Sequence, residues 1–132
     1  MTISVSDSFR YKIINIIEKF NIRELCDLFH IDKFHWEVKG TSLLSGTYKT
    51  QYDFYTKVLN RLERHITSNS KILVKNYYSC KQTLILELEG KMKTIDCRDY
   101  NNQYCWIIEI DGNHIISITA YLDTLLLDKI LN

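Results

Sequence analysis

Residues 103–122, QYCWIIEIDGNHIISITAYL, decide the fold of this 132-residue chain. Two segments rich in β-branched and aromatic residues, 103–110 and 114–122, flank the triplet Asp111-Gly112-Asn113. Glycine and asparagine tolerate positive φ angles, so the triplet predicts the turn of a β-hairpin. Both faces of the two predicted strands are largely apolar, and strands of this kind need a cover on each side.

The preceding segments, 71–80 and 82–94, also have the period of two that is typical of strands. In the second of them Leu84, Leu86 and Leu88 point to one side, while Glu87 and Glu89 point to the other. We expect that strand to have one solvent-exposed face.

The N-terminal half has helical periodicity instead. Ser6 or Asp7 can cap a helix with one apolar face, and Asn21 followed by Glu24 resembles the capping box of a second, short helix. Residues 33–40 predict a first strand that ends at Gly40, and residues 41–50 predict a loop. A third helix is expected from about residue 50 to residue 65, with its apolar face formed by Tyr52, Tyr55, Leu59, Leu62 and Ile66.

This order of elements predicts an α+β fold in which N-terminal helices pack on a curved, mostly antiparallel sheet, giving a cone-shaped, cystatin-like domain. The length suits a single domain over residues 1–132. Asp123 is expected to cap a closing helix over 124–131. Because the helices cover one face of the sheet, we expect a homodimer joined through the other face. Cones of this kind usually hold a hydrophobic pocket.

Composition excludes several classes of function. A net charge of +1 gives no indication of a basic surface that would bind nucleic acid or an anionic membrane. The apolar segments are too short to span a membrane. The N-terminus has no apolar signal core, and the four scattered cysteines form no C-x-x-C pair. We therefore expect a cytoplasmic protein with reduced thiols.

Motifs for metals and cofactors are missing from the sequence. The four histidines fall on different predicted elements, and none forms a helical i,i+4 pair with a carboxylate nearby. No glycine-rich phosphate loop and no serine nucleophile motif occurs. We expect neither a metal nor a cofactor.

The segment GTYKT (46–50) before the third helix and the segments DGNHI (111–115) and AYLDT (120–124) at the end resemble the SnoaL-like and ketosteroid-isomerase-like family. This family belongs to the nuclear-transport-factor-2-like (NTF2-like) cone folds, and the resemblance covers nearly the whole chain. It includes isomerases, polyketide cyclases, epoxide hydrolases and proteins that only bind. Its epoxide hydrolases have Asp where this chain has Ala120, and an Arg-x-Asp pair that is absent from 81–94.

Ketosteroid isomerases have an Ala-Tyr pair in their last strand, which SITAYL (117–122) matches. Laid on DLFHIDKFHWEVKG (27–40), their general base falls at Glu37. Their two oxyanion donors fall at Tyr11, with a two-residue insertion, and at Gln103. The resemblance implies that Glu37 moves a proton while Tyr11 and Gln103 stabilise an enolate. Strand alternation supports a different interpretation, in which Glu37 lies on the solvent side, opposite Trp36.

An apolar wall is expected along the last strand. Ile116, Ile118, Ala120 and Leu122 alternate on the side that lines the cone in relatives, and with Trp36 they are expected to contact a small apolar ligand. The same residues also suit a plain core. Tyr104 and Trp106 alternate to the side opposite Gln103 and are assigned to packing or to the dimer contact.

Three functional hypotheses follow. The chain is a cofactor-independent acid–base isomerase or cyclase that acts on a carbonyl compound, a protein that binds an apolar molecule without chemistry, or a dimeric protein-interaction module. Buried, clustered polar groups favour the first, an aliphatic pocket the second, and a filled cone with an exposed apolar patch the third. Whether the protein is an enzyme stays open at this point.

Overall fold

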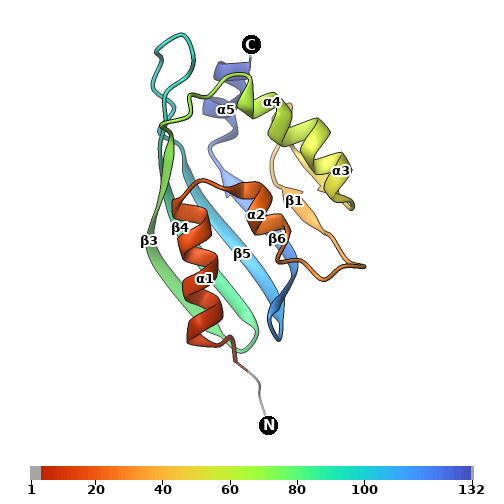
Figure 1. Cartoon of the computed structure of the whole chain (residues 1–132). Coiled ribbons are helices and arrows are strands. Elements are labelled where there is room, and N and C mark those ends of the chain that lie inside the picture. Colours follow the sequence, from red (N-terminus) through yellow and green to blue (C-terminus); the bar gives the residue numbers. More distant parts are fainter. Residues whose placement is uncertain (1–3, 132) are drawn as a thin grey trace.

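The computed structural model describes residues 4–131 as helices packed on a single curved sheet (Figure 1). The sheet has six strands in the order β2-β1-β6-β5-β4-β3. All neighbouring strands are antiparallel except β1 and β6, which are parallel. The predicted α+β class is confirmed. The strands are β1 (Trp36–Val38), β2 (Gly46–Tyr48), β3 (Lys71–Cys80), β4 (Thr83–Lys91), β5 (Gln103–Asp111) and β6 (His114–Leu122).

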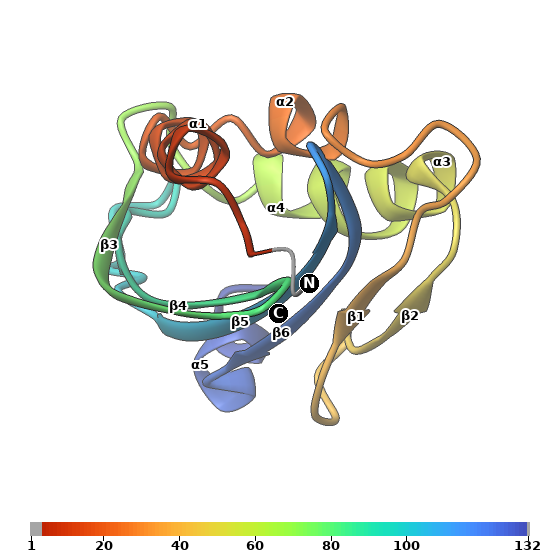
Figure 2. The same cartoon turned by 90° about the horizontal axis from the view of Figure 1, so that it is seen from below.

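The N-terminal helices lie across the concave face of the sheet (Figure 2). They are α1 (Asp7–Glu18), α2 (Ile22–Cys26) and a third helix made of α3 (Gln51–Phe54), the π-helical turn η1 (Tyr55–Leu59) and α4 (Asn60–Glu63). The last helix, α5 (Thr124–Leu131), follows β6 at the end of the sheet opposite the β5–β6 turn (Figure 1). No helix among the described residues is long and apolar enough to cross a membrane.

Side-chain caps begin the helices where the sequence predicts them. Ser6 Oγ accepts a hydrogen bond from the Phe9 amide at 3.2 Å, and Asn21 Oδ1 accepts one from Glu24 at 3.1 Å. Asp123 Oδ1 likewise accepts one from the Leu126 amide at 3.1 Å. Each cap satisfies an N–H group that has no partner within its own helix. The predicted capping role of Asp123 is confirmed.

A bulge in β6 changes which of its residues face the concave side. The register passes from the pair Glu109–Ser117 to the pair Ile110–Ile115, so β6 holds one additional residue, Ile116. Ile115 consequently faces inward and is 0% exposed, while Ile116 is half-buried. The expectation that Ile116 belongs to the inner wall therefore does not match the structure, because simple alternation does not hold across a bulge.

The third helix and the segment before it also differ from the sequence-based expectation. Tyr52 is 75% exposed, and Phe54 and Val58 are buried in addition to the expected Leu59 and Ile66. The π-helical turn shifts the apolar face because it accommodates more residues per turn than an α-helix. Part of the predicted loop is strand β2, whose Tyr48 is buried and donates a hydrogen bond to the Leu44 carbonyl at 2.6 Å.

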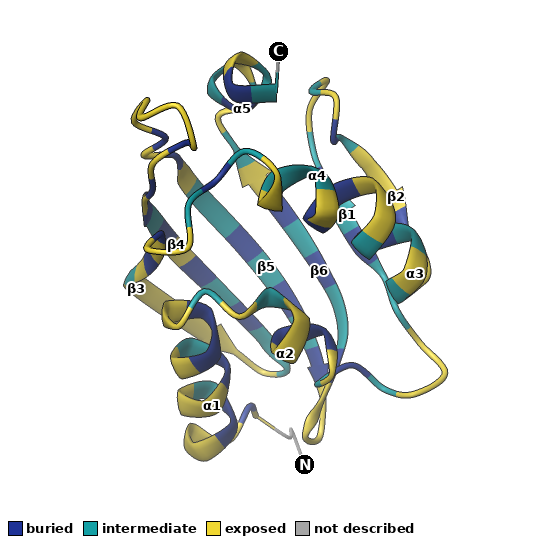
Figure 3. Cartoon of the chain, turned by 45° about the horizontal axis from the view of Figure 1, so that its top comes forward, coloured by how far each residue is buried: buried dark blue, intermediate teal, exposed yellow. Residues whose placement is uncertain are grey.

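Buried residues form bands across β4, β5 and β6 (Figure 3). Leu84, Ile108 and Ile118 are register neighbours on these strands, and each is 0% exposed. Helix α1 packs above this end of the sheet with Ile13 and Ile17. We call this region the aliphatic half of the core; its members are Ile13, Ile17, Leu25, Leu84, Leu86, Ile108, Ile110, Ile115 and Ile118.

Candidate ligand-binding cavity

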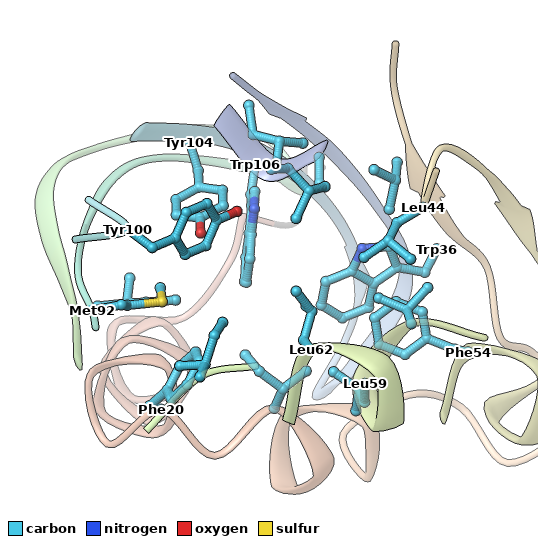
Figure 4. Close-up of a pocket in the computed structure, with 18 residues that line it drawn as sticks. Phe20, Trp36, Leu44, Phe54, Leu59, Leu62, Met92, Tyr100, Tyr104 and Trp106 are labelled. Atoms are coloured by element: carbon cyan, nitrogen blue, oxygen red, sulfur yellow. The ribbon is translucent and has the colours of Figure 1, made fainter. Parts of the chain in front are cut away.

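The other half of the core encloses a cavity of about 80 Å³ (Figure 4). It lies between the first residues of β5, the last residues of β6 and the helices that cover them. We call this region the aromatic half. The lining residues are Phe20, Ile22, Trp36, Val38, Leu44, Phe54, Val58, Leu59, Leu62, Ile66, Ile72, Met92, Tyr100, Tyr104, Trp106, Ala120, Leu122 and Leu127.

A row of aromatic rings crosses this half from β2 to β5. Tyr48 meets Phe54 at a centroid distance of 5.8 Å, and Phe54 stacks on Trp36 at 4.3 Å. Trp36 meets Trp106 edge to face at 5.3 Å, and Trp106 meets Tyr104 at 6.1 Å. Such pairs add stability beyond their buried area and hold the rings in fixed orientations.

The cavity arises where a small side chain stands among large ones. Ala120 of β6 is the register partner of Trp106 on β5 and of Val38 on β1. An alanine side chain ends at Cβ, and the rigid indole beside it cannot fold over to fill the space. Protein interiors are otherwise packed without voids of this size, so the gap is a feature of this site.

Polar atoms gather on one side of the cavity, which we call the polar corner. They are Tyr100 Oη, Tyr104 Oη and Trp106 Nε1 (Figure 4). Asn102 Nδ2 donates to Tyr100 Oη and to the Asp123 carbonyl, both at 3.0 Å. Asn102 Oδ1 accepts from the amides of Gln103 at 2.8 Å and Asp123 at 3.0 Å. Asn102 thereby ties the start of β5 to the end of β6 behind the polar corner.

The tyrosines of the polar corner sit in an environment that disfavours negative charge. Burial raises the pKa of Tyr104 well above its usual range, and the neighbouring Tyr100 raises it further. Burial also raises the pKa of Tyr100, against the lowering effect of the hydrogen bond that it accepts from Asn102. Both phenols are therefore neutral at physiological pH.

A second cavity, of about 380 Å³, adjoins the first from the side of the helices. Exposed side chains of α2 and α4 form its rim, where Arg23 makes an ion pair with Glu63 and donates to Asn60 Oδ1 at 2.9 Å. The two cavities share Phe20, Ile22, Leu59, Leu62 and Ile66. These five side chains therefore form a shared wall that separates the two cavities.

Phe20 occupies the shared wall because of an unusual backbone conformation. Its φ angle is +55°, and its amide and that of Asn21 donate to the carbonyls of Ile17 at 2.9 Å and Ile16 at 3.3 Å. This is a Schellman motif, in which the left-handed residue is usually glycine. A left-handed phenylalanine costs about 1–2 kcal/mol. This backbone conformation places the large ring of Phe20 between the two cavities.

Glu37 lies outside the cavity. It is the middle residue of β1, between Trp36 and Val38, which both line the cavity. Successive side chains of a strand point to opposite faces, so Glu37 points away from them. Its carboxylate is 30% exposed and pairs with Lys39 Nζ at 2.9 Å. This geometry matches the solvent-side interpretation of Glu37.

Tyr11 and Gln103 lie outside it as well. Tyr11 is 65% exposed on the outer surface of α1, with the Arg10 guanidinium 5.8 Å from its ring. Gln103 begins β5, is exposed, and points to the face opposite Tyr104. The structure does not bring Glu37, Tyr11 and Gln103 together.

The expected ligand-binding residues are partly brought together. Trp36, Ala120 and Leu122 line the cavity, while Ile118 is buried in the aliphatic half next to it. Tyr104 and Trp106, which the sequence assigned to packing or to the dimer contact, line the cavity instead. Their alternation with Gln103 was the available signal, because residues opposite an exposed polar position on a covered strand face the core.

Known structures share this fold over nearly their whole length. An NTF2-like protein from Burkholderia thailandensis has a TM-score of 0.77 at 12% identity, covering 95% of each chain. An NTF2-like protein from Cytophaga hutchinsonii has a TM-score of 0.66 at 17% identity, covering 89% of this chain and 98% of its own. No family model matches the sequence, and no curated protein matches it.

A third neighbour comes from Catenulispora acidiphila and has a ketosteroid-isomerase-like fold, in complex with trimethylamine. Its TM-score is 0.68 at 13% identity, over 89% of this chain and 86% of its own. At these identities the comparisons establish the fold alone. The chain has the NTF2-like cone fold, and the resemblance drawn from its sequence is confirmed at that level.

Proposed function

We propose that this protein binds a small apolar molecule in the cavity of its aromatic half and does so without catalysis. The observation that carries the proposal is the cavity itself, about 80 Å³ of unfilled space walled by aliphatic and aromatic side chains. A site for one water needs roughly 10–15 Å³ on this scale, and an apolar cavity stays dry and accepts apolar guests. The space suits a compact molecule of about six non-hydrogen atoms.

The residues that line the cavity do not support the alternative function as an isomerase or cyclase. An acid–base mechanism on a carbonyl compound needs a group that accepts a proton near neutral pH. None of the described residues that line the cavity is a carboxylate, a histidine or a lysine. The only titratable side chains there are Tyr100 and Tyr104, and burial keeps both protonated. Binding is the function that this set of residues supports.

The test is direct titration with cyclopentane and methylenecyclopentane, followed by chemical-shift changes of the lining methyl groups. We expect saturable binding with a dissociation constant on the order of 1 mM, the range open to so few atoms. Ala120→Val places two carbons in the cavity and should weaken binding, whereas Thr119→Val changes the opposite face of the same strand and should not. Absence of saturable binding by the wild type contradicts the proposal.

We also propose that two copies associate through the outward face of the sheet. Ile85, Ile107 and Thr119 are register neighbours there, all half-buried, and Tyr121 beside them is 45% exposed. An apolar surface of this kind marks an association site when it is continuous. Sedimentation equilibrium should show a dimer. The variant Ile107→Lys should be monomeric, and the variant Tyr11→Lys, which changes an exposed residue, should remain dimeric. A monomeric wild type at high micromolar concentration rejects the idea.

The cytoplasmic location expected from the sequence remains a proposal, supported by the thiols. The four cysteines are free, and Cys80 and Cys97 are exposed. Exposed thiols persist in reducing compartments and are oxidised outside them. Counting reactive thiols in protein isolated under rapid alkylation tests this, since recovery of an oxidised form contradicts it.

A further inference from the structure

The polar corner holds a hydrogen-bond donor with no acceptor. Trp106 is 5% exposed, and its Nε1 is one of two buried side-chain polar atoms without a partner among the described residues, the other being Ser70 Oγ. An indole nitrogen can only donate. A buried donor left unpaired destabilises a protein, so native structures usually satisfy it.

A second donor lies beside it. The Tyr100 oxygen accepts a hydrogen bond from Asn102 Nδ2 at 3.0 Å. Its own hydroxyl proton is left for donation, and no hydrogen bond donated by it is present among residues 4–131. Figure 4 shows Tyr100, Tyr104 and Trp106 on one side of the central space.

The amide of the corner has no acceptor to spare. Both lone-pair directions of the Asn102 side-chain oxygen are used by the amides of Gln103 and Asp123. The remaining acceptors are the two phenolic oxygens, which also carry protons, while the indole nitrogen can only donate, so an acceptor on the ligand is the group that Trp106 requires. An anion would accept from both donors, yet none of the described residues that line the cavity is cationic, so nothing there compensates the burial of its charge.

We propose that the cavity selects a compact neutral molecule that has a hydrogen-bond acceptor, such as a small ketone, ether or nitrile, and that Trp106 Nε1 donates to this acceptor. The inference rests on the proposed binding function and adds the ligand's chemistry to it. Apolar side chains on the remaining wall hold the hydrocarbon part of the molecule.

Neighbouring side chains cover Trp106 Nε1. They must therefore move before the acceptor atom of the ligand can reach this nitrogen. Met92 lines the same side of the cavity as Tyr100 and Tyr104 (Figure 4). Its unbranched thioether has several rotamers of similar energy and can vacate space for a ligand. The aromatic rings around it are held by their mutual contacts and stay in place.

Two probes of nearly equal shape isolate the hydrogen bond. Cyclopentanone and methylenecyclopentane differ in an oxygen against a CH₂ group, so only the first can accept. Nitrogen–proton spectra of the wild type report directly, because the chain has two tryptophans and Trp36 serves as an internal reference. We expect cyclopentanone to move the Trp106 indole resonance downfield and methylenecyclopentane to leave it close to its free position.

Trp106→Phe removes the donor and keeps an aromatic ring. Tyr48→Phe is the matched control, because it removes another buried donor from the same row of rings at a residue that is not among those lining the cavity. The ratio of the two affinities should shift toward the hydrocarbon by roughly tenfold in Trp106→Phe, the effect of one hydrogen bond. The ratio in Tyr48→Phe should stay near that of the wild type. The wild-type spectra remain decisive where a variant fails to fold.

Each outcome has one meaning. A downfield shift confined to Trp106, together with the loss of preference in Trp106→Phe, supports the inference. Binding of both probes with no indole shift, or with an unchanged affinity ratio in Trp106→Phe, overturns the inference and leaves the binding function intact. Failure of both probes to bind overturns the proposed function and the inference with it.

Discussion

The two halves of the core are built on the same strands and differ in how completely they are filled. In the aliphatic half, isoleucine and leucine side chains from β4, β5, β6 and α1 leave no residue more than 1% exposed. In the aromatic half, flat rings from β1, β2 and β5 enclose a cavity of about 80 Å³. Branched aliphatic chains can interdigitate, whereas large rigid rings beside an alanine cannot close the last space.

This difference assigns stability to one half and ligand binding to the other. A closely packed region stabilises the folded state through van der Waals contacts and buried apolar area. Side chains around a cavity lack part of these contacts and contribute less. The strained backbone at Phe20 and the unpaired Trp106 nitrogen also belong to the aromatic half. Strain and unsatisfied polar groups concentrate where proteins bind ligands.

The largest effect is expected from Ile108→Ala in the aliphatic half. The side chain is 0% exposed between Leu84 and Ile118, and its loss opens a new cavity. We expect the free energy of unfolding to fall by about 4 kcal/mol. The matched change Ile72→Ala enlarges the existing cavity and should cost about 2 kcal/mol, since Ile72 already lacks neighbours on one side. Urea unfolding measures both, and equal losses would contradict the comparison.

The next effect is expected at Asn102, which supports the polar corner. Asn102→Ala leaves the amides of Gln103 and Asp123 without their acceptor in a buried position. We expect a loss of about 3 kcal/mol in urea unfolding. The neighbouring Asn101 is exposed and accepts one hydrogen bond from Met92 at 3.2 Å, so Asn101→Ala should cost about 1 kcal/mol or less. Similar losses at both positions would show that Asn102 has no special role.

The elements of the fold were not equally predictable from the sequence. The period-two pattern of Leu84 and its neighbours, the hairpin triplet at Gly112 and the caps at Ser6 and Asn21 are local signals, and the structure agrees with them. The bulge at Ile116 and the π-helical turn after Phe54 leave no comparable signal. Each inserts a residue into a regular element, so the expected face holds on only one side of that point.

The candidate site was harder to predict because a cavity depends on several elements at once. Glu37 was selected from the order of residues along one strand, and the same strand alternation places it opposite Trp36 and Val38. Tyr100 precedes β5 in a segment without periodicity, and its partners Asn102 and Tyr104 become meaningful only after β5 and β6 pair. The unpaired state of Trp106 Nε1 depends on all side chains around it.

Alkaline pH should lower the free energy of unfolding, because it ionises tyrosine hydroxyls that are buried in the aromatic half of the folded protein. The pKa of Tyr104 is raised by burial, so above pH 10 the unfolded chain loses this proton while the folded chain keeps it. Stability is therefore fully present below pH 10 and falls as pH rises, by about 1.4 kcal/mol per pH unit for each such group. Tyr55, whose pKa is raised to about 12 mainly by burial, adds to the same loss.

The variant Tyr104→Phe tests this dependence of stability on pH, because it removes one of the tyrosine hydroxyls whose pKa is raised. Between pH 10 and pH 11 its unfolding free energy should fall by about 1 kcal/mol less than that of the wild type, because an unfolded tyrosine is already half ionised at pH 10. Tyr52→Phe, at a position that is 75% exposed, is the matched control and should follow the wild type. Parallel pH profiles for wild type and Tyr104→Phe would reject the assignment.

Filling the cavity should change stability less than any of these. Ala120→Val adds two carbons where space exists, and we expect a gain of about 0.5–1 kcal/mol in urea unfolding. Thr119→Val controls for the strand preference of valine on the opposite face of β6. A loss of more than 1 kcal/mol, as overpacking of a filled core produces, would show that the aromatic half is as closely packed as the other.

The smallest effect is expected from Glu37→Gln, which bears on whether the aromatic half contains a catalytic base. The Glu37 carboxylate pairs with Lys39 at 2.9 Å on the face of β1 that turns away from the cavity. Its entry into the cavity would require β1 to rotate and expose Trp36, which stacks on Phe54 at 4.3 Å. We therefore expect cyclopentanone affinity to be unchanged in the variant. Deuterium exchange at the carbons next to the carbonyl, followed by proton NMR, should be no faster with wild type than with buffer. Exchange that wild type accelerates and Glu37→Gln abolishes would instead make the protein an acid–base enzyme, with a conformation of β1 that this structure does not contain.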